Sequence, residues 1–184
     1  IDRITPGGVV TADGVEHSVD VLVWATGFHV TDSYTYVDIT GVGGEDLVDR
    51  WNAEGMAAHR GITVAGMPNL FFLLGPNTAL GHNSVVFMIE SQIRYAAQAI
   101  AAVDAAGAAA LAPSRRAQDE FNAELQRDLA GTVFSTGGCQ SWYMDAHGVN
   151  RTLWSGMTWQ YWLATRTFEP SEYVFTPQPE MARS

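Results

Sequence analysis

The sequence is poor in cysteine and in basic residues. Its 184 residues include one cysteine, Cys139, which excludes an internal disulfide and indicates a reducing cytoplasm. No cysteine or histidine pair has the spacing of a zinc site, so we expect no metal. Ten lysines and arginines stand against twenty aspartates and glutamates, a formal net charge of −10. Because this charge repels polyanions, we expect no nucleic-acid partner.

Long apolar runs are also missing. The most apolar stretch, residues 96–112, is mostly alanine and is interrupted by Gln98, Asp104 and Gly107, so it falls short of a membrane span. We therefore expect neither a membrane partner nor a signal peptide. The chain starts at Ile1, without methionine and directly in strand-like sequence, from which we expect a part of a longer polypeptide.

Several catalytic signatures are absent as well. There is no GxSxG for a serine hydrolase and no second cysteine for a disulfide reductase. The GxGxxG of dinucleotide-binding folds is missing, and the GVGG at 41–44 does not replace it because Asp46 stands at the sixth position. The histidines show no ligand spacing; they are His17, His29, His59, His82 and His147.

The elements that are present alternate between strand and helix patterns. Up to residue 28 the sequence predicts a strand meander, with a hairpin at Asp13-Gly14, that leads into a buried strand over the apolar run 21–25. Residues 29–60 lack a sustained period and predict a surface excursion, and residues 69–74 predict another strand.

Two helices follow. The first is expected from Val85 to about Ala106, with Ile89, Ile93 and Ile100 near one face. The second is expected after Ser114 as N-cap, with apolar residues every fourth position, and ends by Gly131; those apolar positions are Phe121, Leu125 and Leu129.

The loop GPNTALGHNS, residues 75–84, joins the predicted strand to the first helix and has two interpretations. It ends a strand and caps a helix through Asn83 or Ser84, as isolated loops of this kind do. Alternatively, the free N–H groups at Ser84 to Val86 and the positive end of the helix hold an electron-rich ligand group. The loop by itself leaves both open.

Several weak motifs in a fixed order resemble a known family. VDVLVWATGF at 19–28 is followed by NLF, Gly-Pro-Asn and a helix containing Ile-Glu, and later by CQSWY at 139–143 with Asn150, Trp154 and Gly156. This order resembles the C-terminal portion of FAD- and NADPH-dependent Baeyer–Villiger monooxygenases, on the aryl-ketone branch, and their flavin-containing monooxygenase relatives. The resemblance covers nearly the whole chain.

The resemblance implies an α/β fold: the C-terminal part of a flavoprotein with two Rossmann-like dinucleotide-binding domains, lacking the N-terminal βαβ units. Residues 1–26 would end the NAD(P)H-binding domain, 27–131 would form the C-terminal half of the FAD-binding domain, and 132–184 an aromatic-rich C-terminal segment. The implied cofactors are FAD and NADPH. The implied reaction inserts one oxygen atom of O2 into a ketone.

The resemblance also implies the site residues. The catalytic residues are expected upstream of Ile1. Those facing the cofactor would be Thr26, Gly27, Gly75, Pro76, Asn77, His82, Asn83, Ser84 and Val85. Those on the substrate or nicotinamide side would be Trp142, Tyr143 and Trp154, although Trp154 serves equally well as a core aromatic.

Alternatives from other classes remain. The same resemblance fits a monooxygenase that acts on nitrogen or sulfur, and the chain as it stands could be a non-catalytic truncated piece. The sequence gives neither the substrate nor the oligomeric state.

Overall fold

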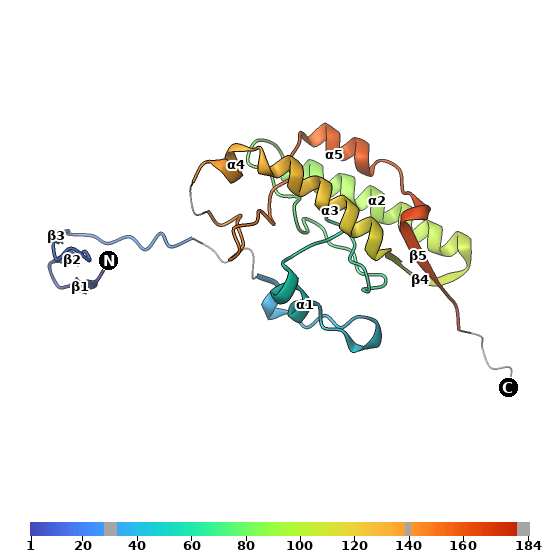
Figure 1. Cartoon of the computed structure of the whole chain (residues 1–184), viewed down its shortest axis with the longest axis horizontal. Helices are drawn as coiled ribbons and strands as arrows, with labels where there is room; N and C mark the ends of the chain where they lie inside the picture. The colour runs from blue at the N-terminus through green and yellow to red at the C-terminus, as the bar shows by residue number, and fades with distance from the viewer. Residues whose placement is uncertain (28–32, 139–140, 180–184) are drawn as a thin grey trace.

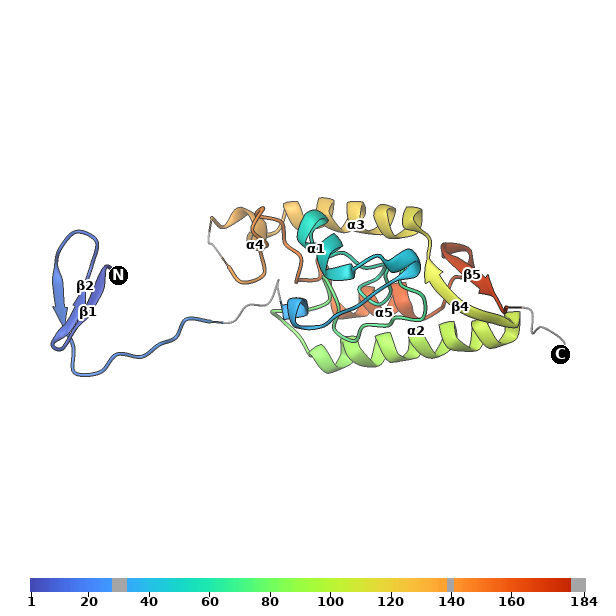
Figure 2. The same cartoon turned by 90° about the horizontal axis from the view of Figure 1, so that it is seen from below.

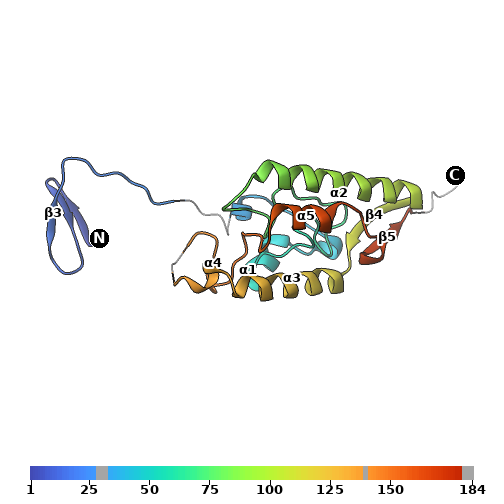
Figure 3. The same cartoon turned by 90° about the horizontal axis from the view of Figure 1, so that it is seen from above.

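The computed structural model describes residues 1–27, 33–138 and 141–179 of the chain (Figure 1). At the N-terminus, β1 (Arg3–Thr5), β2 (Gly8–Val10) and β3 (Glu16–Ser18) form an antiparallel sheet in the order β1-β2-β3. The turn between β2 and β3 contains Gly14, whose φ of 84° lies in the left-handed region that favours glycine. The predicted meander and its Asp13-Gly14 hairpin are therefore confirmed. The meander stands apart from the rest of the molecule in all three views (Figures 1, 2 and 3).

The predicted buried strand at 21–25 is wrong for this structure. Residues 21–27 are extended without strand pairing, and Val21, Val23 and Trp24 are 77%, 77% and 66% exposed. A strand of this apolar kind is buried only when neighbouring strands pair with it and helices cover both faces. No described segment of the chain pairs with it, so its apolar side chains lie in solvent.

The main body is built mostly from helices and irregular chain. Figures 2 and 3 show α2 and α3 on opposite flanks, with the irregular segment 55–80 filling the space between them. The helices are α1 (Leu47–Glu54), α2 (Val85–Ala106), α3 (Arg115–Ala130), α4 (Val133–Thr136) and α5 (Thr158–Thr165), with short 3-10 turns at Ser33–Tyr36, Val42–Gly44 and Pro170–Glu172. β4 (Ala108–Pro113) pairs antiparallel with β5 (Tyr173–Pro177). No helix among the described residues has the length and apolar character that crossing a bilayer requires.

The bounds predicted for α2 and α3 are confirmed. Gly107 ends α2 in the left-handed conformation, with φ at 60°. Ser114 caps α3, because its side-chain oxygen accepts a hydrogen bond from the Ala117 N–H at 3.1 Å. Leu125 and Leu129 on α3 are buried as expected.

The buried face of α2 is not the one that carries the predicted row of isoleucines. Ile93 and Ile100 are 50% and 53% exposed, and the buried residues are Met88, Ser91, Gln92, Tyr95 and Ala99. The isoleucines therefore form a second apolar stripe that faces outward. Hydrophobicity alone does not identify the buried face of α2, because that face includes the polar side chains of Ser91 and Gln92.

The region predicted as a surface excursion, 29–60, contributes to the core. Leu47 and Trp51 of α1 are buried with Met56, Ala58, Val64 and Met67 in one apolar cluster. A second cluster joins Ile62 to α2, β4 and β5 and consists of Ile62, Tyr95, Ala99, Leu111, Phe168 and Tyr173. Part of the excursion, residues 29–32, lies outside the described residues.

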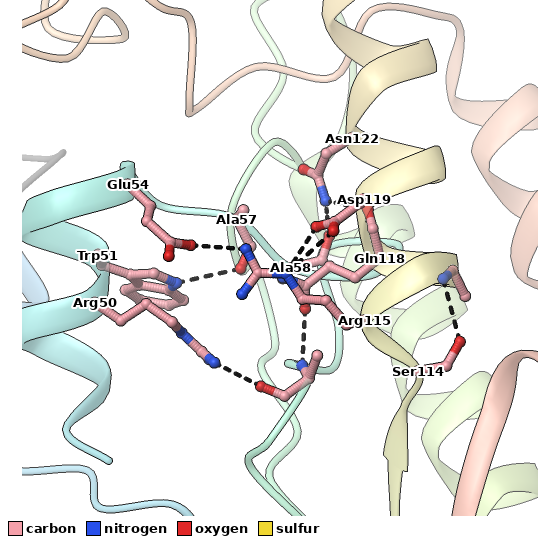
Figure 4. Close-up of polar contacts among 12 residues, drawn as sticks. Arg50, Trp51, Glu54, Ala57, Ala58, Ser114, Arg115, Gln118, Asp119 and Asn122 are labelled. Atoms are coloured by element: carbon pink, nitrogen blue, oxygen red, sulfur yellow. Dashed lines mark hydrogen bonds and ion pairs between the residues drawn. The ribbon is translucent and has the colours of Figure 1, made fainter.

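Polar contacts join α1 and the chain after it to α3 (Figure 4). Arg115 on α3 forms an ion pair with Glu54 of α1 at 2.9 Å. Asn122 donates to the Ala58 carbonyl at 3.1 Å, and the buried Gln118 accepts from the Ala65 N–H at 2.8 Å. The bonds from Asn122 and Gln118 satisfy backbone groups of an irregular segment that has no partner in a helix or sheet.

The predicted strand at 69–74 is also wrong. Phe71 makes one isolated bridge to Thr63, and the chain is otherwise irregular here. Asn69 and Leu74, at the two ends of the run, have left-handed φ values of 57° and 60°. A left-handed residue interrupts strand geometry, so the apolar run packs as loop rather than as sheet.

Candidate functional site

An apolar cavity of about 320 Å³ brings the 75–84 loop and the aromatic C-terminal segment together. Its walls include Leu74, Gly75 and Pro76 from the start of the loop and Trp142 from the C-terminal segment. Trp51 of α1, Phe72 and Tyr34 complete the aromatic lining; the ring centroids of Trp51 and Phe72 are 5.5 Å apart. We call this space the Trp142 cavity. Three of its wall residues, Gly75, Pro76 and Trp142, belong to the predicted site.

Asn77 fastens the loop to the C-terminal segment. It is buried with a φ of 57°, and its side-chain amide donates to the carbonyls of Asn150 and Leu153 at 2.9 and 3.0 Å. Its N–H donates to the Arg151 carbonyl at 3.0 Å. Two residues on, Ala79 pairs with Leu153 in a parallel bridge. Both amide hydrogens of Asn77 are thus used within the chain, so its contact in this structure is with backbone.

Gly75 faces another glycine. A Cβ at Gly75 would clash with the Gly61 carbonyl oxygen and come within 2.7 Å of Phe72 Cβ. A Cβ at Gly61, whose φ is 67°, would clash with Thr78 and come within 2.7 Å of the Pro76 carbonyl oxygen. Both positions therefore require glycine for packing of the 59–63 turn against the loop. At Gly75, the space that a side chain would occupy is therefore filled by Gly61 and Phe72 of the chain itself.

The start of α2 is open to solvent. Gly81, His82, Asn83 and Ser84 are all exposed, and Val85 is half-buried. Ser84 occupies the N-cap position but its side chain makes no capping bond, and the first turn carries no acidic residue. Instead, Asn83 accepts from the Ser84 N–H at 2.7 Å. The N-terminus of a 22-residue helix is therefore left without a hydroxyl cap or a neutralising charge.

The aromatic residues of the predicted site fall into two groups. Trp142 is 54% exposed and packs edge-on against Tyr143, with ring centroids 5.6 Å apart. Tyr143 in turn contacts Phe134 at 5.6 Å, and Phe134 lies beside Gly81. The Trp154 N–H donates to the carbonyl of Ala79 in the loop at 2.9 Å, but its ring packs on Tyr161 at 5.2 Å. The structure thus brings all three residues to the loop and directs the Trp154 ring to α5.

The remaining predicted residues are not brought to the cavity. Thr26 and Gly27 lie in the exposed segment after the N-terminal meander, apart from the main body (Figure 1). Phe28 and Cys139 of the quoted motifs lie outside the described residues.

Sequence reasoning missed Arg151, which borders the Trp142 cavity. Its guanidinium bonds Asp145 at 3.1 Å and the Glu54 carbonyl at 3.2 Å. Burial opposes ionisation of Asp145, but hydrogen bonds from Val149, Arg151 and His147 outweigh it and hold the Asp145 pKa below its usual value. The pair fixes the turn that follows Trp142. An isolated arginine in VNRTLW carries no motif that could have predicted this contact.

A second polar cluster lies at the 59–63 turn, which packs against the loop through Gly61. Arg60 binds Glu172 through both carboxylate oxygens at 2.7 and 2.8 Å, and the buried His59 binds Glu172 at 2.9 Å. Burial lowers the His59 pKa, against the effect of Glu172. Burial would raise the Glu172 pKa, but the bonds from Arg60 and His59 keep it lowered. The cluster borders a separate cavity of about 390 Å³. Its ion pairs fix the turn that contains Gly61, which packs against the loop.

The arrangement suits a ligand that is flat, largely apolar and electron-rich at one edge. The Trp142 cavity offers aromatic and aliphatic walls, and the uncapped start of α2 offers backbone N–H groups at the positive end of a helix. A flavin ring has both properties, so the residues present fit it. Among the described residues, no group of acidic, histidine and cysteine side chains could hold a metal ion.

Comparisons with known proteins agree with each other. No family model matches the chain. A Baeyer-Villiger monooxygenase of Pseudomonas aeruginosa is 43% identical, covering 100% of this chain and 35% of that protein. The closed crystal structure of cyclohexanone monooxygenase matches with a TM-score of 0.75 and 28% identity, over 97% of this chain and 34% of the other. An oxidized steroid monooxygenase bound to NADP matches with a TM-score of 0.76 and 27% identity, over 95% and 33%. The chain therefore spans about a third of the length of these relatives.

Proposed function

The chain belongs to the Baeyer–Villiger monooxygenases, and from this premise we propose that it supplies one wall of the flavin and substrate site of such an enzyme. The expected fold class, part of an α/β flavoprotein, is confirmed, as is the family's use of FAD and NADPH. We propose that the whole enzyme inserts one oxygen atom of O2 into a small-molecule ketone at the expense of NADPH.

The observation that carries this proposal is the Trp142 cavity. Residues 74–76 and Ala79 are far from Trp142 in the sequence, yet they line one apolar space with it, and the same loop leads into the uncapped start of α2. Two separate features that the resemblance assigns to cofactor and substrate thus meet at one place. The apolar lining excludes water, which protects a reactive oxygen species from decay.

The chain's own residues have distinct tasks in this proposal. Bound FAD supplies the redox and oxygen chemistry, as cofactors do. The N–H groups of the first turn of α2, Val85 and Val86, would stabilise negative charge at the flavin edge, whereas the Ser84 N–H already bonds Asn83. Gly75 and Pro76 form the wall at the loop, and Trp142 bounds the substrate or nicotinamide side. Asn77 holds this wall to the 150–153 segment through two hydrogen bonds.

The domain boundaries stay a proposal: 1–26 ends the NAD(P)H-binding domain, 27–131 belongs to the FAD-binding domain, and 132–184 is the C-terminal segment. The end of α3 at Ala130 supports the second boundary. However, β5 pairs with β4 and Asn77 binds Asn150, so the C-terminal segment packs as one body with residues 33–131. We also propose a cytoplasmic location, which the single cysteine supports.

The test is purification of the full-length protein, followed by its absorption spectrum and product analysis. We expect a flavin spectrum, NADPH consumption that depends on a ketone, and an ester or lactone that carries one oxygen atom from labelled O2. Oxygenation of amines or sulfides with no ester formed would favour nitrogen or sulfur chemistry. A colourless protein that binds no FAD would refute the proposal.

A further inference from the structure

Leu74 begins the wall of the Trp142 cavity in a conformation that its side chain disfavours. Its φ is 60°, in the left-handed region where a Cβ crowds the backbone. Such a residue persists only where surrounding structure fixes it. The next residues are Gly75 and Pro76, so the backbone of Leu74 decides how the cavity wall is placed.

A buried hydrogen-bond chain holds Leu74 in this conformation. The Leu74 N–H donates to Gln92 Oε1 at 2.7 Å. Gln92 Nε2 donates to the Tyr161 hydroxyl at 3.1 Å, and that hydroxyl donates to the Arg60 carbonyl at 2.7 Å. Gln92 is fully buried on α2 and Tyr161 is 1% exposed on α5. The Leu74 N–H is thus linked through Gln92 of α2 and Tyr161 of α5 to the carbonyl of Arg60.

The order of donors in this chain fixes the orientation of the Gln92 amide. The Arg60 carbonyl can only accept, so the single hydroxyl proton of Tyr161 is used there. The Tyr161 oxygen can therefore only accept from Gln92, so Gln92 must donate through its NH2 group. That places Oε1, and not Nε2, against the Leu74 N–H. A flipped amide would set two donors against each other at Leu74.

We propose that Gln92 is a positioning residue for the flavin and substrate wall, and that Tyr161 sets the orientation of its amide. The inference rests on the proposed function, because the wall is the one assigned to the cofactor and substrate there. Gln92 acts through the backbone of Leu74 and borders neither the cavity nor the start of α2. Its role is to keep Gly75 and Pro76 at a fixed place.

A matched control exists on the same helix. Gln98 also uses both ends of its amide, donating to the Arg166 carbonyl at 3.1 Å and accepting from the Phe168 N–H at 3.1 Å. These two partners lie after α5, away from the loop, and Gln98 also donates to the Arg94 carbonyl on α2 itself at 3.2 Å. Gln92→Met and Gln98→Met therefore each remove a side-chain amide that joins α2 to another segment, Gln92 at a buried and Gln98 at a half-buried position, and only the first touches Leu74.

The experiment uses the full-length enzyme and compares Gln92→Met, Gln98→Met and the double variant Gln92→Met/Leu74→Gly. Amide hydrogen exchange of the segment 72–77, FAD retention and the split between KM and kcat are measured. We expect about tenfold faster exchange in Gln92→Met, the effect of one lost hydrogen bond, with weaker FAD retention or raised KM. Gln98→Met should leave the exchange of 72–77 and FAD retention unchanged.

The double variant tests the strain directly. Glycine adopts a φ of 60° without steric strain, so Leu74→Gly should return the exchange of 72–77 in Gln92→Met toward the wild-type rate. Equal effects of Gln92→Met and Gln98→Met, or no change at 72–77, would overturn the positioning role. A wild-type protein without flavin would instead refute the proposed function, while the exchange data would still report whether Gln92 holds the loop.

Discussion

Replacing Glu172 by glutamine tests the polar cluster behind the loop. Glutamine keeps the shape of the side chain, but it loses the charge that Arg60 and His59 share. It also offers one oxygen where the carboxylate offers two, and turns an NH2 donor toward Arg60 or His59. The turn 59–63, which packs through Gly61 against the loop, should loosen as a result.

The magnitude follows from the burial of the partners. Removing one member of a fully buried pair costs about 3–5 kcal/mol, whereas exposed pairs contribute about 0–1 kcal/mol. The side chains of Arg60 and Glu172 are 16% and 26% exposed, so we expect about 2 kcal/mol. For a chain of this length that corresponds to a fall of roughly 4–8 °C in Tm.

The dependence on pH has a definite sign. The Glu172 pKa is lowered in the folded protein, so its contribution is complete above the ordinary value of 4.5 and disappears as the pH falls through the folded pKa. The difference in stability between wild type and Glu172→Gln should therefore be largest at pH 7 and should decrease as the pH falls below 4.5. Burial also lowers the His59 pKa below 6.5, so both proteins should lose stability as the pH falls below that value.

Thermal unfolding of the 184-residue chain, followed by circular dichroism between pH 4 and 8, measures both effects. Glu120→Gln is the control, because Glu120 pairs with Arg116 on the surface of α3 and its loss should hardly change Tm. The reasoning is refuted if Glu172→Gln unfolds at the wild-type temperature at pH 7. It is also refuted if the difference in Tm stays constant down to pH 4.

Three further predictions concern the flavin site. In the full-length enzyme, Trp142→Ala should lower coupling or turnover more than Tm, since Trp142 is 54% exposed; kinetics and melting curves check this, and a variant that only unfolds would indicate a core role. Ser84→Asp adds a negative charge at the start of α2 and should lower the flavin reduction potential or release FAD, whereas an unchanged potential with full FAD occupancy would mean that the loop is only a helix cap. Residues 1–184 alone should oxidise no NADPH, because the chain lacks the GxGxxG fingerprints, and steady NADPH-dependent turnover by the purified chain would contradict that expectation.

Local signals in the sequence predicted the helices well. The bounds of α2 and α3 follow from Gly107, Ser114 and Gly131, which act through backbone geometry and capping within a few residues. The Asp13-Gly14 hairpin is local in the same way. Such features depend on neighbours in the chain, which the sequence displays directly.

Features that depend on distant partners were missed or misplaced. The run 21–25 was expected to be buried, yet it lies exposed because no described strand pairs with it. The inner face of α2 is set by Gln92 and Tyr95, whose partners come from α5 and β5. For the candidate site, the motifs indicated Gly75, Pro76 and Trp142. The lining by Trp51 and the Arg151 contact could not be predicted, because they arise when three segments pack together.

The bonds from Asn77 to the 150–153 segment have a consequence for how the chain folds. They close loops of 73 and 76 residues, and Gln92 to Tyr161 closes another of 69. Contacts of such long range form late and slow the folding of small proteins, because the entropy of loop closure is lost before the contact is gained. On a ribosome, the 75–79 loop would emerge long before its partners. The cavity wall is therefore completed only when nearly the whole chain has been synthesised, because Asn77 needs the 150–153 segment as its hydrogen-bond partner.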